Sequence, residues 1–199
     1  MLAAFCASAM TYATDKQRVP PAPDLPGVQL NFQNSQASEI LALYKTLVPE
    51  ELVVDSGIQA GVPVTVETKG VVSREKAVEI IESTLMLNGY ALLQQAPGTI
   101  KVLGPSRFPR AEGTPVYYAP SDLPKGERVI TYFMSLKNIE PAEALKLFTA
   151  QVSPPKRYSS FVAAPNANAV LITESTSVIR QLVGMQPSFD VKSQAAKSK

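Results

Sequence analysis

Histidine and tryptophan are absent from this sequence of 199 residues, and there is a single cysteine, Cys6. The absence of histidine removes the commonest general base and the commonest metal ligand in proteins. A lone cysteine cannot form a disulfide within the chain, and it cannot build a cysteine-rich metal site. We therefore expect no metal, no cofactor and no intramolecular disulfide.

A large excess of charge is also missing. The formal net charge is +2, and charged residues make up 18% of the sequence against 45% hydrophobic residues. This balance is typical of a globular protein, and it gives no basic surplus that would attract nucleic acid or an anionic membrane. Nucleic acid is therefore excluded as an expected partner.

Motifs for catalysis are equally scarce. Neither the G-x-x-x-x-G-K-[ST] loop nor the G-x-G-x-x-G loop occurs, so no phosphate cradle is expected. Ser73 and Lys76 have the S-x-x-K spacing of penicillin-binding enzymes, but no S-D-N or K-T-G follows. We interpret Ser73 as a helix cap, and we interpret the nearby Glu75, Glu79 and Glu82 as a solvated helix face. No catalytic residue is predicted, and the protein is not expected to be an enzyme.

Proline clusters divide the chain. Residues 1–14 begin with a small apolar run that ends near Ala7-Ser8-Ala9, which is typical of an export signal, although the usual positive charge is missing and a frayed apolar tail is the alternative. Residues 15–27 and 104–127 are predicted to be proline-rich linkers. The aromatic residues of the second linker, Phe108, Tyr117 and Tyr118, are expected to lie against a domain surface. Residues 191–199 are predicted to be a polar tail.

The first block, residues 28–103, is predicted to be a small α+β domain of order β-α-β-β-α-β-β. Strands are indicated by alternating apolar residues, and helices by apolar residues at helical spacing. Ser35 or Ser38 is the expected cap of the first helix, and Ser73 is the expected cap of the second. The apolar face of the first helix is predicted to consist of Ala37, Ile40, Leu41, Tyr44 and Leu47.

The second block, residues 128–190, is predicted to be an α+β domain of order β-α-β-β-α. Asn138 is the expected cap of a helix that carries Pro141 in its first turn. This order is also that of KH-type RNA-binding domains, but the GXXG loop that clamps the RNA backbone is absent. Both blocks are expected to have small sheets covered by helices on one side.

Surfaces remain as the candidate functional features. The first strand, Val28 to Phe32, is predicted to be a sheet edge with Gln29, Asn31 and Gln33 facing outward, where a partner chain could add a strand. The first block carries more acidic than basic residues, and the second block carries more basic than acidic residues. This difference favours head-to-tail packing, and an ordinary solvated surface is the alternative.

Several runs of sequence resemble a known family. VQLNFQNSQASEILALY, the pattern G-x-x-S-x-E-x-A-x-x-I-I-x-x-x-L from Gly70 to Leu85, and TIKVLGPSR resemble the domain shared by bacterial secretins and the signalling domain of TonB-dependent transducers. VITYFMSLKNIEPAEALKLF, FVAAPNANAVLITES and SVIRQLVGMQPSFD resemble the repeated secretin domain that follows it. The two domains in this order favour the secretin over the transducer, because transducers carry only the first.

The resemblance implies a module without catalytic activity in the periplasm, associated with the outer membrane. Such domains stack as rings below an outer-membrane pore, with secretin subunits touching head to tail through the second domain. The first domain meets inner-membrane components of type II secretion or type IV pilus machines, and exported proteins are further candidate partners. No pore-domain sequence is present, so the resemblance implies a ring and docking module without the pore. A sensing module related to the transducers is the alternative.

Overall fold

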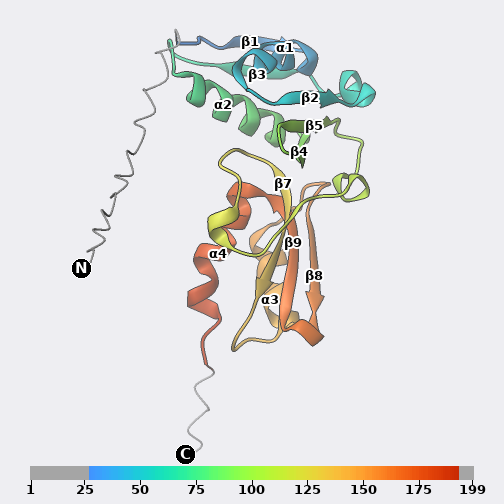
Figure 1. The fold of residues 1–199 in the computed structure, drawn as a ribbon, viewed down its shortest axis with the longest axis vertical. Helices are drawn as coiled ribbons and strands as arrows, with labels where there is room; N and C mark the ends of the chain where they lie inside the picture. The colour runs from blue at the N-terminus through green and yellow to red at the C-terminus, as the bar shows by residue number, and fades with distance from the viewer. Residues whose placement is uncertain (1–26, 193–199) are drawn as a thin grey trace, which may run out of the picture.

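The computed structural model describes residues 27–192. The predicted export segment, almost all of the first linker and most of the polar tail lie outside these residues. Figure 1 shows the two blocks one above the other, with the first block at the top and the second below it. The helices and small sheets in both blocks confirm the predicted α+β fold class.

The first block contains two small sheets and two α-helices. Strand β1 pairs with β3 in one sheet, and the second sheet has the order β2-β5-β4. Helix α2 contacts both β3 and β4, so the helices lie between the two sheets. The elements are β1 (Asn31–Ser35), α1 (Ala37–Leu47), β2 (Glu51–Val54), the short turn η1 (Ser56–Ala60), β3 (Val64–Glu67), α2 (Arg74–Leu87), β4 (Ala91–Ala96) and β5 (Thr99–Leu103).

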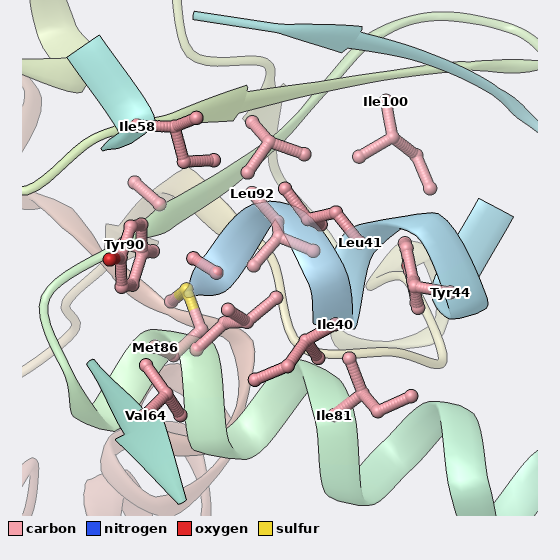
Figure 2. Packing of buried hydrophobic residues seen from close by; sticks show 14 of the residues in the cluster. Ile40, Leu41, Tyr44, Ile58, Val64, Ile81, Met86, Tyr90, Leu92 and Ile100 are labelled. Carbon is pink, nitrogen blue, oxygen red and sulfur yellow. The ribbon is translucent and has the colours of Figure 1, made fainter. Parts of the chain in front are cut away.

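The helical spacing of apolar residues positions these helices. All five residues predicted for the apolar face of α1 are buried. In Figure 2, Ile40, Leu41 and Tyr44 of α1 lie among side chains from α2 and from the strands. Burying one aliphatic or aromatic side chain of this size contributes roughly 1.5–3 kcal/mol, so this cluster is the main source of stability of the block.

Helix capping follows the prediction at only one clear position. The Ser73 hydroxyl accepts a hydrogen bond from the Lys76 backbone N–H at 3.2 Å, as expected. Neither Ser35 nor Ser38 caps α1, whose N-cap residue is Gln36 and makes no side-chain cap bond. Asn138 does not cap α3 either, because its side-chain amide donates to the carbonyl of Asp190 at 2.7 Å.

The second block is a four-stranded sheet of order β6-β7-β9-β8 with two helices on one face. Strands β7 and β9 are antiparallel over seven residue pairs. The helices cover one face because Ile130, Tyr132, Ile172 and the apolar residues of the helices share one buried cluster. The elements are β6 (Val116–Tyr117), β7 (Val129–Ser135), α3 (Pro141–Gln151), β8 (Ser160–Ala164), the turn η4 (Pro165–Ala167), β9 (Ala169–Ser175) and α4 (Thr176–Phe189).

The segment 104–127 is more regular than a linker. It forms the turns η2 (Pro109–Glu112) and η3 (Pro120–Asp122), and between them β6 runs parallel to β7. The carbonyl of Pro115 accepts a hydrogen bond from the Thr131 N–H at 2.9 Å, which a proline can do although it has no N–H of its own. The segment is thus part of the second sheet.

The two blocks also share packing. Val129 and Tyr158 of the second block belong to the buried cluster of the first block. A second cluster lies wholly within the second block and the segment that precedes it. Within residues 27–192, no helix is long and apolar enough to cross a membrane.

Candidate functional site

The predicted docking edge was the strand Val28 to Phe32, but in the structure β1 begins only at Asn31 and Gln29 lies in the extended stretch before it. Gln29, Asn31 and Gln33 are exposed, whereas Leu30 is fully buried. Among the described strands, β1 pairs only with β3, so its other side has no neighbouring strand.

Backbone hydrogen bonds identify which groups face the open side of β1. Val28 and Leu30 bond across to Val72 and Thr68 respectively. In an antiparallel pair such bonds alternate along the strand, so the N–H and C=O groups of Gln29 and Asn31 point toward the open side. The edge ends in a bulge at Asn34, whose φ of 51° lies in the left-handed region. Nothing in the periodicity predicted this bulge.

A second open surface is the helix-free face of the second sheet. Its apolar residues, which we call the open face, are Val116, Tyr118, Phe133, Val162 and Leu171. Phe133 and Val162 are both register partners of Leu171, so their side chains share one side of the sheet. The Tyr118 ring lies 5.6 Å from the Phe133 ring between centroids, and Tyr118 and Val162 are 69% and 51% exposed. Isolated exposed apolar residues are ordinary, but a contiguous row of them is typical of an interaction surface.

An ion pair occupies the junction between the two blocks. Glu82 of α2 is 1% exposed and Arg128, just before β7, is 5% exposed. Arg128 Nη1 lies 2.7 Å from Glu82 Oε1. The same oxygen accepts a hydrogen bond from the Tyr44 hydroxyl at 2.5 Å, and Oε2 accepts one from the Glu127 N–H at 2.8 Å. We call Tyr44, Glu82 and Arg128 the ion-pair cluster.

The position of Glu82 corrects the sequence-based interpretation. Glu82 was expected on a solvated helix face with Glu75 and Glu79, but only those two are exposed. Glu82 is instead directed into the junction, where Arg128 neutralises its charge. The available signal was its place between Ile81 and Leu85, beside the buried stripe of α2.

Burial and charge set the protonation of this cluster. Burial would by itself lower the pKa of Arg128, but the neighbouring Glu82 and Tyr44 raise it above its ordinary value. Burial raises the pKa of Tyr44 strongly, against the opposing effect of Arg128. The Tyr44 hydroxyl therefore stays protonated and acts as a donor, so the cluster acts as a structural tie between the blocks.

Gly126 passes close to the same ion pair. A Cβ atom added at Gly126 would lie 2.5 Å from Glu82 Oε2 and 3.1 Å from Arg128 Nη1. A larger residue would therefore push the carboxylate away from its partner.

A second set of contacts joins the loop that follows β5 to both blocks. Arg107 binds both carboxylate oxygens of Asp55, with its Nε and Nη2 atoms at 3.0 and 2.9 Å. Arg110 donates to the Ser160 hydroxyl at 3.0 Å, and the Arg157 guanidinium lies 5.6 Å from the centre of the Phe108 ring. Phe108 is 58% exposed, whereas the predicted packing of linker aromatics is found for Tyr117, which is packed against the core of the second block.

The Ser73–Lys76 pair shows no arrangement for catalysis. Ser73 caps the helix, and the Lys76 ammonium lies 2.9 Å from the exposed carboxylate of Glu79. Within residues 27–192, no group of three or more acidic or cysteine side chains could hold a metal ion.

Comparison with known proteins gives a family match for the first block. Residues 30–102 match the family model described as GspD-like, N0 domain, so the first block is a domain of this type. This is a domain of a secretion component, which confirms the prediction of a protein without enzymatic activity. None of the curated proteins searched matches the sequence.

Solved structures extend the similarity over both blocks. A chain of the Klebsiella pneumoniae type II secretion outer-membrane complex of PulD, PulS and the PulC HR domain aligns with 19% identity and a TM-score of 0.64. The alignment covers 80% of this chain and 26% of that chain, so this chain spans about a quarter of the length of the one it matches. This similarity shows that the two blocks together have the fold of the corresponding part of that chain.

Two other structures align over most of the chain with lower TM-scores. The N-terminal domain of the secretin XcpQ from Pseudomonas aeruginosa has 17% identity and a TM-score of 0.36, and covers 83% of this chain and 66% of that chain. The GspC–GspD complex of enterotoxigenic Escherichia coli has 14% identity and a TM-score of 0.33, and covers 82% of this chain and 98% of that chain.

Proposed function

We propose that this chain is a periplasmic ring and docking module of a secretin-type machine, with type II secretion as the process it serves. The observation that carries the proposal is the match of residues 30–102 to the GspD-like N0 domain. The second block supports it, because a sensing module of the transducer type would need the first domain alone. Subunit assembly and contact with inner-membrane components are the two roles that we assign to its surfaces.

The first block is the proposed docking domain for an inner-membrane component. The edge formed by β1 and the stretch before it offers unpaired backbone groups at Gln29 and Asn31, together with the polar side chains of Gln29, Asn31 and Gln33. Strand addition to such an edge derives affinity from main-chain hydrogen bonds and specificity from the side chains beside them.

The second block is the proposed assembly domain. Its open face lies on one side of the sheet, and α3 and α4 cover the other side with Leu147 and Met185 exposed at 47% and 37%. A sheet face of one copy against the helices of the next would be a heterologous contact, which closes into a ring when the rotation between copies allows it.

Chemical crosslinking of the purified protein, alone and with the periplasmic domain of a GspC-type inner-membrane protein, tests the proposal. We expect crosslinked multimers through the second block and a mixed product through the first block. A protein that stays monomeric at high concentration and captures no inner-membrane component would contradict the proposed function. A type IV pilus component used as the second bait distinguishes the alternative machine.

A further inference from the structure

An exposed aromatic residue lies among arginines at the junction of the blocks. The Arg157 guanidinium lies over the ring of Phe108, and the preceding residue, Arg107, is fixed by Asp55. Arg110 is anchored by the neutral hydroxyl of Ser160. We call Arg107, Phe108, Arg110 and Arg157 the Phe108 knob. Aromatic and arginine residues that are already fixed in place are the residue types that dominate binding energy at protein interfaces.

A cleft lies at the same level of the molecule. It has a volume of about 770 Å³ and is lined by α2, the loop 125–128 and Arg180 of α4. Its apolar wall includes Leu47, Val48 and Val78. In Figure 1 the turn η2, which contains Arg110 of the knob and directly follows Phe108, is on the right of the junction, and α2 and α4 border the junction on the left.

The charges of the knob and the cleft are complementary. Arg110 and Arg157 have no carboxylate partner among the described residues. In the cleft, Glu50 and Glu75 have no hydrogen bond or ion pair with any described residue. Three of the cationic lining residues, Arg74, Arg128 and Arg180, are already bonded to backbone carbonyls or to Glu82. The fourth, Lys125, has no bonded partner among the described residues, so one free ammonium faces the two free carboxylates of Glu50 and Glu75. The cleft therefore has carboxylates available for an incoming cation.

We propose that the Phe108 knob of one copy of this chain inserts into the junction cleft of the next copy. Phe108 contacts the apolar wall, while Arg110 and Arg157 meet Glu50 and Glu75 at its rim. Because the two surfaces lie on opposite sides of the molecule, the contact is head to tail and extends the proposed ring to the level of the junction. This inference rests on the proposed self-assembly and adds a specific contact to it.

A mixing experiment with two single-cysteine proteins tests this contact. Ser106→Cys, which leaves the Phe108 ring in place, and Ser83→Cys are prepared separately in a Cys6→Ser background, since Ser83 lines the cleft and both positions are exposed. Under mild oxidation we expect disulfide-linked dimers in the mixture and little product from either protein alone. Ser106→Cys mixed with Lys137→Cys, at the far end of the second block, is the control and should give no product.

Charge reversal provides the second test. Arg110→Glu with Arg157→Glu should weaken self-association measured by sedimentation by on the order of tenfold for each reversed pair. Adding Glu50→Arg and Glu75→Arg to the partner copy should restore most of the loss. Lys137→Glu with Lys192→Glu changes the net charge equally and should have little effect, because both residues lie away from the knob and the cleft.

The outcomes separate this contact from the proposed function. Multimers that form without the crosslink between positions 106 and 83, and that tolerate the charge reversal, would overturn the knob contact and leave assembly through the second block standing. A mixture that yields dimers linked through position 106 of both copies instead would also overturn it. The absence of any multimer would overturn both.

Discussion

At the scale of single residues, the buried ion pair between Glu82 and Arg128 determines how the two blocks meet. Both charges lie away from water, so their mutual attraction and their hydrogen bonds must offset the cost of desolvation. Such a pair adds little net stability compared with apolar residues. Removing one partner is costly, because it leaves the other charge buried without compensation.

Substitution of Arg128 tests how much stability is lost when Glu82 is left unpaired. Arg128→Met is expected to lower the free energy of unfolding by about 3–5 kcal/mol, measured by urea denaturation, because Glu82 is left as an unpaired buried carboxylate. Adding Glu82→Gln should recover part of the loss by removing that charge. The exposed pair Lys76–Glu79 provides the control, and Lys76→Ala should cost less than about 1 kcal/mol. A double variant that is less stable than Arg128→Met alone would contradict this account.

The buried carboxyl of Glu174 should make the stability of the fold depend on pH. Burial raises the pKa of its carboxyl above 4.5, although the Ser159 hydroxyl and the Ser175 N–H both donate to it and oppose the shift. The folded state therefore binds this proton at a higher pH than the unfolded state does. Stability from this group is present at low pH and is lost as pH rises through the folded pKa.

Glu174→Gln should consequently raise the melting temperature at neutral pH, and the gain should shrink as pH falls toward 4.5. Thermal unfolding followed by circular dichroism over this range measures the effect. Glu67→Gln removes the same charge from the surface and should give no such trend. A gain that grows on acidification would show that burial does not dominate at this site.

At the scale of elements, local pattern predicted the helices better than the edges of the sheets. The apolar residues of α1 and the Ser73 cap depend on neighbours within a few positions, so periodicity was sufficient to find them. Strand β6 has two residues and exists because it pairs with β7, so its own sequence carries no signal. The Glu82–Arg128 pair joins residues 46 positions apart and could not be predicted from either segment alone.

If a partner adds a strand to the open side of β1, removing a backbone N–H on that side should weaken binding. Asn31→Pro removes an N–H that points toward the open side and leaves the bonds to β3 intact, because proline is tolerated where that side of a strand is free. We expect binding of the inner-membrane component to fall by about tenfold in a titration while the melting temperature changes little. Asn31→Ala keeps the N–H, so similar losses in both variants would instead indicate recognition of the side chain.

At the scale of the whole molecule, the two blocks are joined by more than a chain connection. The ion-pair cluster holds one part of the junction, Arg107 and Arg110 hold the loop that bridges the blocks, and Val129 packs into the core of the first block. The sequence predicted two compact units, and their boundaries remain a prediction, but the proline-rich segment gave no indication of this shared packing.

A single cooperative unfolding transition should result. We expect one calorimetric peak for the intact protein, because each block loses packing when the other unfolds. Arg128→Met should separate the peak into two or broaden it. Two well-resolved transitions in the unsubstituted protein would mean that the junction contacts contribute little to stability.

The close approach of Gly126 to the ion pair should limit how these positions vary among related sequences. A methyl group at position 126 would lie 2.5 Å from Glu82 Oε2 and would displace the carboxylate, so we expect positions 82, 126 and 128 to change together. Related sequences should retain all three residues or replace the set together, for example with a shorter acid where a side chain appears at 126. A broad collection of homologues in which position 126 varies independently of the other two would refute this covariation.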